Sequence, residues 1–364
     1  MIPIASPSVG DEEIRAVADV IKSGIIAQGP KVREAEEKFA RLCGTKYAVA
    51  FNSGTAAIHV ASKVAGIKKG DEVITTPFSF IATATPILMQ GAIPIFADVD
   101  ENTFNITPES IKEKITDKTK AIITVDLYGQ LCNYDEINKI AKENNLIVIE
   151  DACQAINAEL NGKKAGTFGS LGTFSLYATK NITCGEGGML ITNNQEYAEN
   201  ARLFRQHGRS KITGYEYMSL GYNYRTTDIN AAILLEQLKK LDSITNKRIE
   251  NAKYLSNALK DIKGIKIPIV KNGKHVFHQF TIKLEDFKLN RDELIAHLKQ
   301  KGISSAVYYP KPLHLLEVFK NLGYKKGDCP IAEKLCSQVL SLPVHPNVTK
   351  DQLNEIINEF KELA

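Results

Sequence analysis

The 364-residue sequence lacks the patterns that indicate a metal site or a disulfide framework. Its six cysteines are scattered, and none forms a C-x-x-C pair or stands beside a histidine pattern. We therefore expect reduced and mostly buried thiols, the state that the cytoplasm favours. The sequence has neither a Walker A segment nor a G-x-G-x-x-G, so the usual fingerprints of nucleotide-binding folds are missing.

Long apolar runs and blocks of one charge are also missing. No stretch reaches the roughly 18 apolar residues that a membrane span needs, and the first residues lack a basic region followed by an apolar core. The 46 basic and 42 acidic residues leave a net charge of only +4, with the lysines spread through helical stretches. Such a surface gives little affinity for nucleic acid. We expect a cytoplasmic protein that binds neither nucleic acid nor a membrane.

Short apolar runs alternate with helical patterns over the first half of the chain. Runs that are apolar on both faces and separated by helices predict a mainly parallel sheet covered on both sides, which is an α/β fold. The runs are 47–51, 72–76, 93–97, 121–125, 146–150, 172–176 and 189–192.

The last third has a different pattern, and a chain of this length exceeds the size at which one core keeps growing. A long charged helix is predicted over 230–242. A strand over 275–284, a helix over 290–301 and a strand over 304–309 follow it. We therefore predict two domains, a large one over 1–240 and a smaller α+β domain over 241–364.

Two charged residues in the first domain form a chemically meaningful pair. Asp151 ends the apolar strand L-I-V-I-E-D, at the carboxyl edge where parallel sheets bind ligands. Lys180 follows an apolar strand containing Ser175 and precedes the turn G-E-G-G. Pyridoxal-phosphate (PLP) enzymes need an acid against the pyridine nitrogen and a lysine that forms a Schiff base. Alone, Asp151 would more often cap a helix and Lys180 would be a solvated lysine; their combination favours the enzyme.

Two further segments suit a phosphorylated, planar cofactor. The residues N-S-G-T at 52–55 end the first run and lead into a helix, where free N–H groups and a glycine favour a phosphate. Ordinary capping of that helix by Ser53 or Thr55 is the alternative. Phe78 and Phe80 follow the second run, and one of these rings would stack on the cofactor or pack in the core.

The chain resembles the sugar aminotransferases of the DegT/DnrJ/EryC1/StrS family in an ordered set of segments: N-S-G-T, T-P-F-S-F-I-A-T-A, D-L-Y-G-Q, E-D-A-C-Q, F-S-L-Y-A-T-K-N, G-E-G-G and G-Y-N-Y-R. The likeness runs from P-S-V-G-D-E-E to L-S-L-P-V-H-P, nearly the whole chain. It implies PLP-dependent transferase fold type I (aspartate-aminotransferase-like), with an N-terminal arm and PLP in the large domain, and a homodimer. It also implies transfer of the amino group of glutamate to a keto group of a nucleotide-linked sugar, in amino-sugar or surface-polysaccharide biosynthesis.

The resemblance assigns roles to single residues. Lys180 would be the Schiff-base lysine, and Asp151 would contact the pyridine nitrogen. No metal is implied, and because one contact comes from the neighbouring subunit, the active sites would be shared across a dimer. The other cofactor contacts would be Gly54, Thr55 and Ser175 at the phosphate, Asn223 reaching the phosphate from the neighbouring subunit, Phe80 on the ring and Gln154 beside the ring hydroxyl.

The same resemblance bears on the substrate. Gln154 in E-D-A-C-Q favours amination at sugar C3 over C4, or of an inosose, although G-E-G-G is more usual in C4 enzymes. Tyr308 departs from the family, which often has a histidine there; together with Arg225 and His314 it is predicted to contact substrate. Arg225 would alternatively be a structural pin at the dimer interface.

Three other functions compete with this one. A sugar-deoxygenating PLP enzyme would replace Lys180 by histidine or bind an iron–sulfur cluster, and cluster spacing is missing. A non-catalytic regulatory or sensory protein that kept the fold would have little reason to retain both the acid and the lysine. An amino-acid transaminase usually has a C-terminal arginine for the α-carboxylate, and no arginine follows Arg291.

Overall fold

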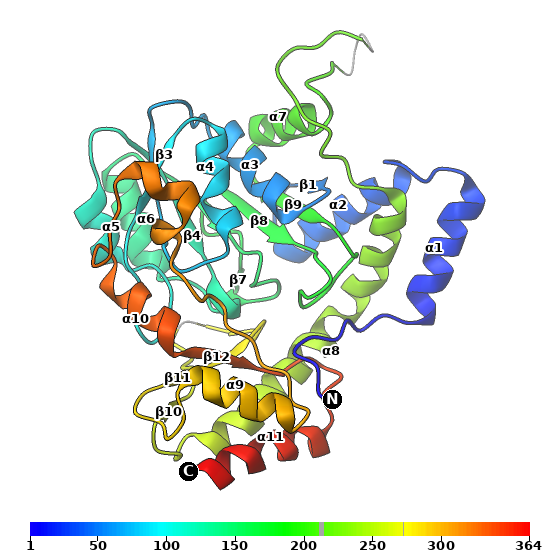
Figure 1. Cartoon of the computed structure of the whole chain (residues 1–364). Coiled ribbons are helices and arrows are strands. Elements are labelled where there is room, and N and C mark those ends of the chain that lie inside the picture. Colours follow the sequence, from blue (N-terminus) through cyan, green and yellow to red (C-terminus); the bar gives the residue numbers. More distant parts are fainter. Residues whose placement is uncertain (211–214, 272) are drawn as a thin grey trace.

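The computed structural model describes residues 1–210, 215–271 and 273–364, and Figure 1 shows its arrangement. Within those ranges no helix is long and apolar enough to cross a membrane. The strands are β1 (Tyr47–Phe51), β2 (Glu72–Thr75), β3 (Ile93–Phe96), β4 (Thr119–Val125), β5 (Ile147–Asp151), β6 (Glu159–Leu160), β7 (Lys163–Lys164), β8 (Leu171–Ser175), β9 (Gly188–Thr192), β10 (Ile265–Lys266), β11 (Phe280–Leu284) and β12 (Val339–Leu342). The helices are α1 (Asp11–Ser23), α2 (Pro30–Cys43), α3 (Gly54–Val64), α4 (Thr85–Met89), α5 (Pro108–Lys114), α6 (Tyr134–Glu143), α7 (Gln195–Arg205), α8 (Asp228–Leu259), α9 (Arg291–Gln300), α10 (Pro330–Gln338) and α11 (Lys350–Leu363), with 3₁₀ turns at Ile81–Thr83, Leu127–Gly129, Leu313–Leu315 and Glu317–Leu322.

The central sheet has seven strands in the order β1-β9-β8-β5-β4-β2-β3. The neighbouring pairs from β3 through to β8 are all parallel, whereas β9 runs antiparallel to both β8 and β1. All seven runs that the apolar pattern predicted are strands of this sheet. The mainly parallel α/β prediction is therefore confirmed.

Alternate residues of the strands enter two cores, one on each face of the sheet. On one face Val49 and Phe51 pack with α3 and α7. On the other face Ala48 and Ala50 pack with α2, α6 and α8, around the fully buried ring of Phe39. This burial on both faces explains why the strands are unbroken apolar runs in the sequence.

The helix α8 connects the large sheet to the small antiparallel sheet β10-β11-β12 (Figure 1). Ile244 belongs to the core on the large sheet, and Leu255 belongs to the core under β11 and β12. The predicted helix over 230–242 is thus only the first part of a longer one. We propose that the boundary between the domains 1–240 and 241–364 falls inside this helix, where one core gives way to the other.

Two predictions in the smaller domain need correction. Of the predicted strand over 275–284, only the second half is the strand β11. The predicted strand over 304–309 is wrong, because only Ala306 exchanges two backbone hydrogen bonds with Ser341 of β12. Pro310 follows shortly and has no N–H with which to extend the pairing, so the chain leaves the sheet there.

A buried carboxylate from α8 caps the helix α2. The side chain of Asp228 accepts hydrogen bonds from the backbone N–H groups of Gly29 (2.8 Å), Lys31 (3.1 Å) and Val32 (3.0 Å). These are N–H groups that have no acceptor inside a helix, and a negative charge at a helix start is favourable. A Cβ on Gly29 would lie 2.6 Å from the side chain of Ile25 and 2.7 Å from the carboxylate, so a larger residue would displace the cap. This cap joins two helices that are far apart in the sequence.

We expect Asp228→Ala to lower the free energy of unfolding by about 3 kcal/mol, because three N–H groups, one buried and two part-buried, lose a buried charged acceptor. Urea denaturation at a fixed protein concentration measures the change. The control is Asp351→Ala, which removes an exposed carboxylate from the first turn of α11 and should cost less than about 0.5 kcal/mol. Equal losses in the two variants would contradict a special role for this cap.

Candidate active site

The carboxyl ends of β1, β2, β5 and β8 meet at one edge of the large sheet. β1 is parallel to β8 because both pair antiparallel with β9. The segments that follow these ends therefore lie together, as expected for a ligand site in such a sheet. They carry Gly54, Phe80, Asp151 and Ser175, so four predicted cofactor contacts come from one edge.

Asp151 is buried, and hydrogen bonds fix its carboxylate in place. It accepts from the Thr83 hydroxyl (2.7 Å) and from the N–H of Cys153 (3.2 Å). The Ser79 hydroxyl lies 2.9 Å from that of Thr83 and extends the chain of bonds. We did not single out Thr83 from the sequence, although it stands in the segment T-P-F-S-F-I-A-T-A. The carboxylate is thereby oriented before any ligand binds.

Lys180 lies in the loop after β8, half-buried and in the electrostatic neighbourhood of Asp151. Burial lowers the pKa of its amine, whereas Cys153 and Asp151 raise it, and the net shift is downward. A lowered pKa enlarges the uncharged fraction of the amine, which is the form that attacks a carbonyl and accepts a proton. The structure thus brings together the acid and the lysine that the sequence paired.

The predicted phosphate contacts surround the start of α3. A Cβ on Gly54 would lie only 2.9 Å from the Cβ of Ser175, so glycine is needed for this approach. The Ser53 hydroxyl caps the helix by accepting from the N–H of Ala56 (3.1 Å). The N–H groups of Gly54 and Thr55 come earlier in the turn, where a helix has no acceptor for them. The capping alternative is therefore confirmed for Ser53, and phosphate binding by the remaining groups stays a prediction.

Two aromatic residues and an amide form the next part of the site. The side chain of Phe80 is 56% exposed, and its ring centroid lies 6.3 Å from that of Tyr309. Gln154 donates to the Tyr309 hydroxyl (3.2 Å) and accepts from the N–H of Tyr128 (2.9 Å). Tyr309 was missed in favour of its neighbour Tyr308, whose carbonyl accepts a hydrogen bond from the Tyr128 hydroxyl. An exposed ring such as Phe80 is suited to stacking on a planar cofactor.

The other predicted contacts are Asn223, Arg225 and His314. Asn223 is exposed, and its carbonyl accepts from the side chain of Asn52 (3.4 Å). Arg225 is half-buried on the same segment. His314 is buried, with its Nε2 3.1 Å from the carboxylate of Glu333 in α10. These contacts of His314 belong to the core beside β3, and its role at the substrate stays a prediction.

Buried polar groups that the sequence did not reveal lie near Lys180. Burial, followed by the charges of Lys180 and Arg248, lowers the pKa of His278 well below its ordinary value. Arg248 donates to the backbone carbonyls of Phe277 and His278, each at 3.2 Å. His278 is therefore neutral near pH 7, and Arg248 fixes the chain beside it. Their positions in the sequence do not indicate this contact, because α8 and the segment before β11 meet only in the fold.

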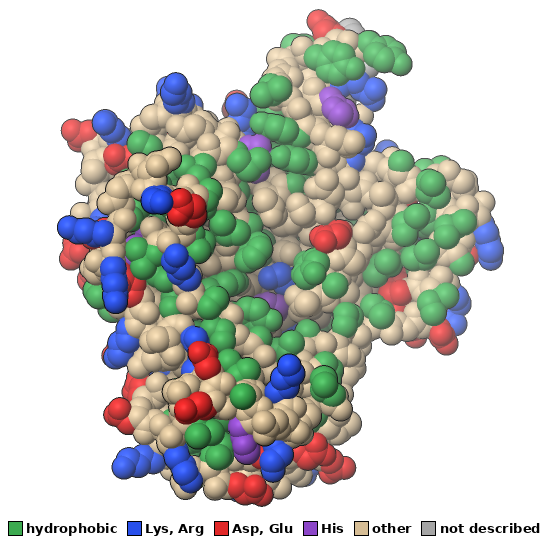
Figure 2. Space-filling view, viewed as in Figure 1, with side chains coloured by type: hydrophobic (Ala, Val, Ile, Leu, Met, Phe, Trp, Pro, Cys, Tyr) green, Lys and Arg blue, Asp and Glu red, His purple; other side chains and the backbone are tan. Residues whose placement is uncertain are grey.

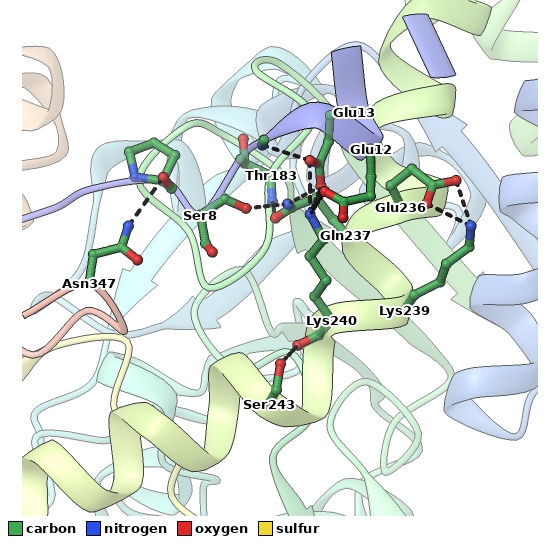
Figure 3. A network of polar contacts seen from close by, with 12 residues as sticks. Ser8, Glu12, Glu13, Thr183, Glu236, Gln237, Lys239, Lys240, Ser243 and Asn347 are labelled. Atoms are coloured by element: carbon green, nitrogen blue, oxygen red, sulfur yellow. Dashed lines mark hydrogen bonds and ion pairs between the residues drawn. The ribbon is translucent and has the colours of Figure 1, made fainter. Parts of the chain in front are cut away.

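The loop after Lys180 is held by Gln237 of α8, which Figure 3 shows among its partners. Gln237 accepts from the N–H of Thr183 (3.4 Å) and donates to the carbonyl of Ser8 (2.7 Å) and to Glu13 (2.8 Å). Lys240 lies one helical turn further on and bonds to both oxygens of Glu13, at 2.7 and 2.9 Å. Burial raises the pKa of Glu13, and the bonds from Lys240, Gln237 and Gly10 lower it overall. The N-terminal arm, α8 and the lysine loop are thus one polar network.

The arrangement suits PLP chemistry. PLP, when bound, supplies a ring that withdraws electrons from the substrate carbon. Asp151 would hold the pyridine nitrogen, the first turn of α3 and Ser175 would hold the phosphate, and Phe80 would cover the ring. Lys180 would bind the cofactor through its amine and would hold or move a proton. The described residues contain no group of three or more His, Cys, Asp or Glu that could hold a metal ion.

Comparison with known proteins gives matches over the whole length. The model of the DegT/DnrJ/EryC1/StrS aminotransferase family matches residues 7–361. A "pleiotropic regulatory protein" of Geobacillus stearothermophilus is 43% identical over 96% of this chain and 94% of that protein. GDP-perosamine synthase of Caulobacter vibrioides is 36% identical over 98% of this chain and 96% of that protein. Helicobacter pylori PseC, an aminotransferase involved in the biosynthesis of pseudoaminic acid, has a solved structure with a TM-score of 0.93 and 30% identity, covering 100% of this chain and 98% of that one.

We expect Gln237→Leu to lower the free energy of unfolding by about 2 kcal/mol and to weaken PLP binding about tenfold, because the loop after Lys180 loses its bond to α8. Urea denaturation and titration of the apoenzyme with PLP measure the two effects. The control Lys239→Met removes a lysine that pairs with Glu236 on the exposed side of α8 and should change neither. Loss of stability with unchanged PLP binding would show that the network does not position the loop.

Proposed function

The chain belongs to the DegT/DnrJ/EryC1/StrS aminotransferase family and is a PLP-dependent aminotransferase of fold type I, as the sequence predicted; from this premise we propose that it transfers the amino group of glutamate to a keto group of a nucleotide-linked sugar. The observation that carries the substrate class is the relation to GDP-perosamine synthase along 98% of this chain. The name of that enzyme specifies a product in which a sugar is joined to the nucleotide GDP.

The smaller domain supports a sugar rather than an amino acid as acceptor. Arg291 is the last arginine of the sequence, and its guanidinium already bonds to the carbonyl of Cys336 and to Asp292 (3.1 Å). It is therefore engaged in holding α9 to the end of α10. We propose that Arg225, on the segment that also carries Asn223, binds an anionic group of the donor or the sugar. A structural role at the dimer interface is the alternative for this residue.

We propose C3 of the sugar as the position that receives the amine, on the basis of Gln154 and its segment E-D-A-C-Q. Gln154 is held between the N–H of Tyr128 and the hydroxyl of Tyr309, so the amide has one fixed orientation next to Asp151. Nuclear magnetic resonance of the aminated product distinguishes C3 from C4. An inosose offered as acceptor tests the remaining alternative.

The donor is tested by the absorption spectrum of the purified protein with PLP. On addition of glutamate, we expect the band at about 420 nm to fall and a band at about 330 nm to rise, because the cofactor takes up the amino group and its electronic structure changes. Glutamine and aspartate at the same concentration are the controls and should act more slowly. A keto sugar that then restores the first band is the acceptor. An unchanged spectrum with glutamate would reject it as the donor.

We also propose that the protein is a homodimer, and two exposed apolar surfaces support this. One lies on α1, where Ile14 and Ile21 are seven residues apart and therefore on one side of the helix, both exposed. The other lies on the projecting segment after α7, where Met218 and Leu220 are exposed, Leu220 to 72%. Figure 2 shows hydrophobic side chains on both of these projections. Surfaces of this kind mark interfaces with other proteins, and here the proposed partner is a second copy.

The shared active site is tested by mixing two inactive variants. Lys180→Ala and Asn223→Ala should each be impaired as homodimers, whereas their heterodimer contains one site with both residues intact. Random mixing makes half of the dimers mixed, so about a quarter of wild-type activity should return. The control pairs Lys180→Ala with Asp151→Asn, two residues of the same subunit's site, and should recover nothing. Equal failure of both mixtures would contradict a shared site.

A further inference from the structure

The segment that carries Asn223 and Arg225 is bound to the phosphate-binding turn of its own subunit. The backbone N–H of Asn52 donates to the carbonyl of Tyr224 (2.9 Å), and the Asn52 side chain donates to the carbonyl of Asn223 (3.4 Å). Asn52 stands two residues before Gly54, at the point where β1 leads into α3. One short stretch of chain therefore connects the turn that serves one site with the residues proposed to serve the other.

Two tyrosines of this segment pack on a buried histidine of α3. The rings of Tyr222 and Tyr224 are stacked, with centroids 4.8 Å apart and an angle of 10° between their planes. The ring of His59 lies 4.9 Å from Tyr222 and 5.9 Å from Tyr224, between centroids. Asn223 lies between the two tyrosines in the sequence and is exposed, as expected where neighbouring side chains point to opposite sides. The histidine thus contacts the segment that would reach the partner.

His59 has one specific polar partner, which is the Tyr224 hydroxyl. Its Nδ1 lies 3.1 Å from that hydroxyl, and its Nε2 is buried with no partner among the described residues. Burial, and to a lesser degree Lys63, lowers the pKa of His59 to about 4, so the ring is neutral near pH 7. A buried imidazole is unfavourable unless it is hydrogen bonded. The bond to Tyr224 accounts for a polar residue at this place.

From this arrangement we infer that His59, through the Tyr224 hydroxyl, is a positioning residue for the active site of the partner subunit. It fixes the direction in which Asn223 and Arg225 project from their own subunit. The inference rests on the proposed homodimer with shared sites. It goes beyond that proposal because it assigns to α3 two functions, binding the phosphate in its own subunit and orienting a phosphate contact in the other.

The first test is the affinity of the apoenzyme for PLP, which requires no substrate. Tyr224→Phe keeps the stacked ring and removes only the hydroxyl, and we expect the Kd for PLP to rise about tenfold, the effect of one hydrogen bond. Tyr222→Phe removes the neighbouring hydroxyl and is the matched control, with less than about a twofold change expected. His59→Leu should reproduce the loss, and His59→Asn, whose amide nitrogen replaces Nδ1, should retain most of the affinity. Equal effects of Tyr224→Phe and Tyr222→Phe would overturn the inference.

The second test decides in which subunit the bond acts. The band at about 420 nm requires Lys180, so PLP titration followed at this band reports only sites that contain the lysine. In a heterodimer of Tyr224→Phe with Lys180→Ala, the one reporting site receives its Asn223 from a subunit with Tyr224 intact, and its Kd should be that of the wild type. In a heterodimer of wild type with the double variant Tyr224→Phe/Lys180→Ala, the Kd should rise about tenfold. The reverse result would place the effect inside one subunit and overturn the inference.

The heterodimer of Asn223→Ala with Lys180→Ala, titrated in the same way, separates this inference from the proposed dimer. A wild-type Kd in that heterodimer supports the shared site. If it is restored and the Tyr224→Phe heterodimer is not, only the role of His59 and Tyr224 is rejected. If the Asn223→Ala heterodimer also keeps its defect, both the shared site and the inference that depends on it are rejected.

Discussion

The close approach of the turn after β1, where α3 begins, to the end of β8 is the constraint on which the site depends. Gly54 allows it on one side, since a Cβ there would collide with Ser175. Gly188 allows it on the other, since a Cβ there would lie 2.1 Å from the carbonyl oxygen of Ser53. With these two glycines the first turn of α3 comes next to the strand that leads to Lys180. A larger residue at either place would separate the phosphate contacts from the lysine.

The helix α8 gives this edge its rigid support. With 32 residues it extends for roughly 48 Å, and polar side chains along it reach separate parts of the molecule. Asp228 caps α2, Gln237 holds the loop after Lys180, and Arg248 holds the chain before β11. Each of these groups is buried and bonded to backbone atoms, so small changes in the direction of this helix would disturb all three regions. The large and the small sheet are consequently joined through the same element that orders the lysine loop.

The sequence predicted those features that depend on local pattern. All seven strands of the large sheet follow from runs that are apolar on both faces, and Asp151 and Lys180 follow from their places after such strands. Thr83, Tyr309 and His59 were not predicted, because each acts through a partner that is distant along the chain. The strand over 304–309 failed because strand propensity does not show how far a segment pairs with its neighbour, and here only Ala306 pairs with β12 before Pro310.

The bonds between Asn52 and the Tyr222–Arg225 segment have a consequence for how the cofactor and the subunits depend on each other. In the proposed homodimer, a segment that contacts one cofactor would be bonded to the turn that holds the other, so binding at either place would favour one arrangement of both. Thermodynamic linkage would then make the effect mutual: PLP would tighten the association of subunits, and association would tighten PLP binding. The apoenzyme would accordingly dissociate at concentrations where the holoenzyme is intact, and dilution alone would release cofactor.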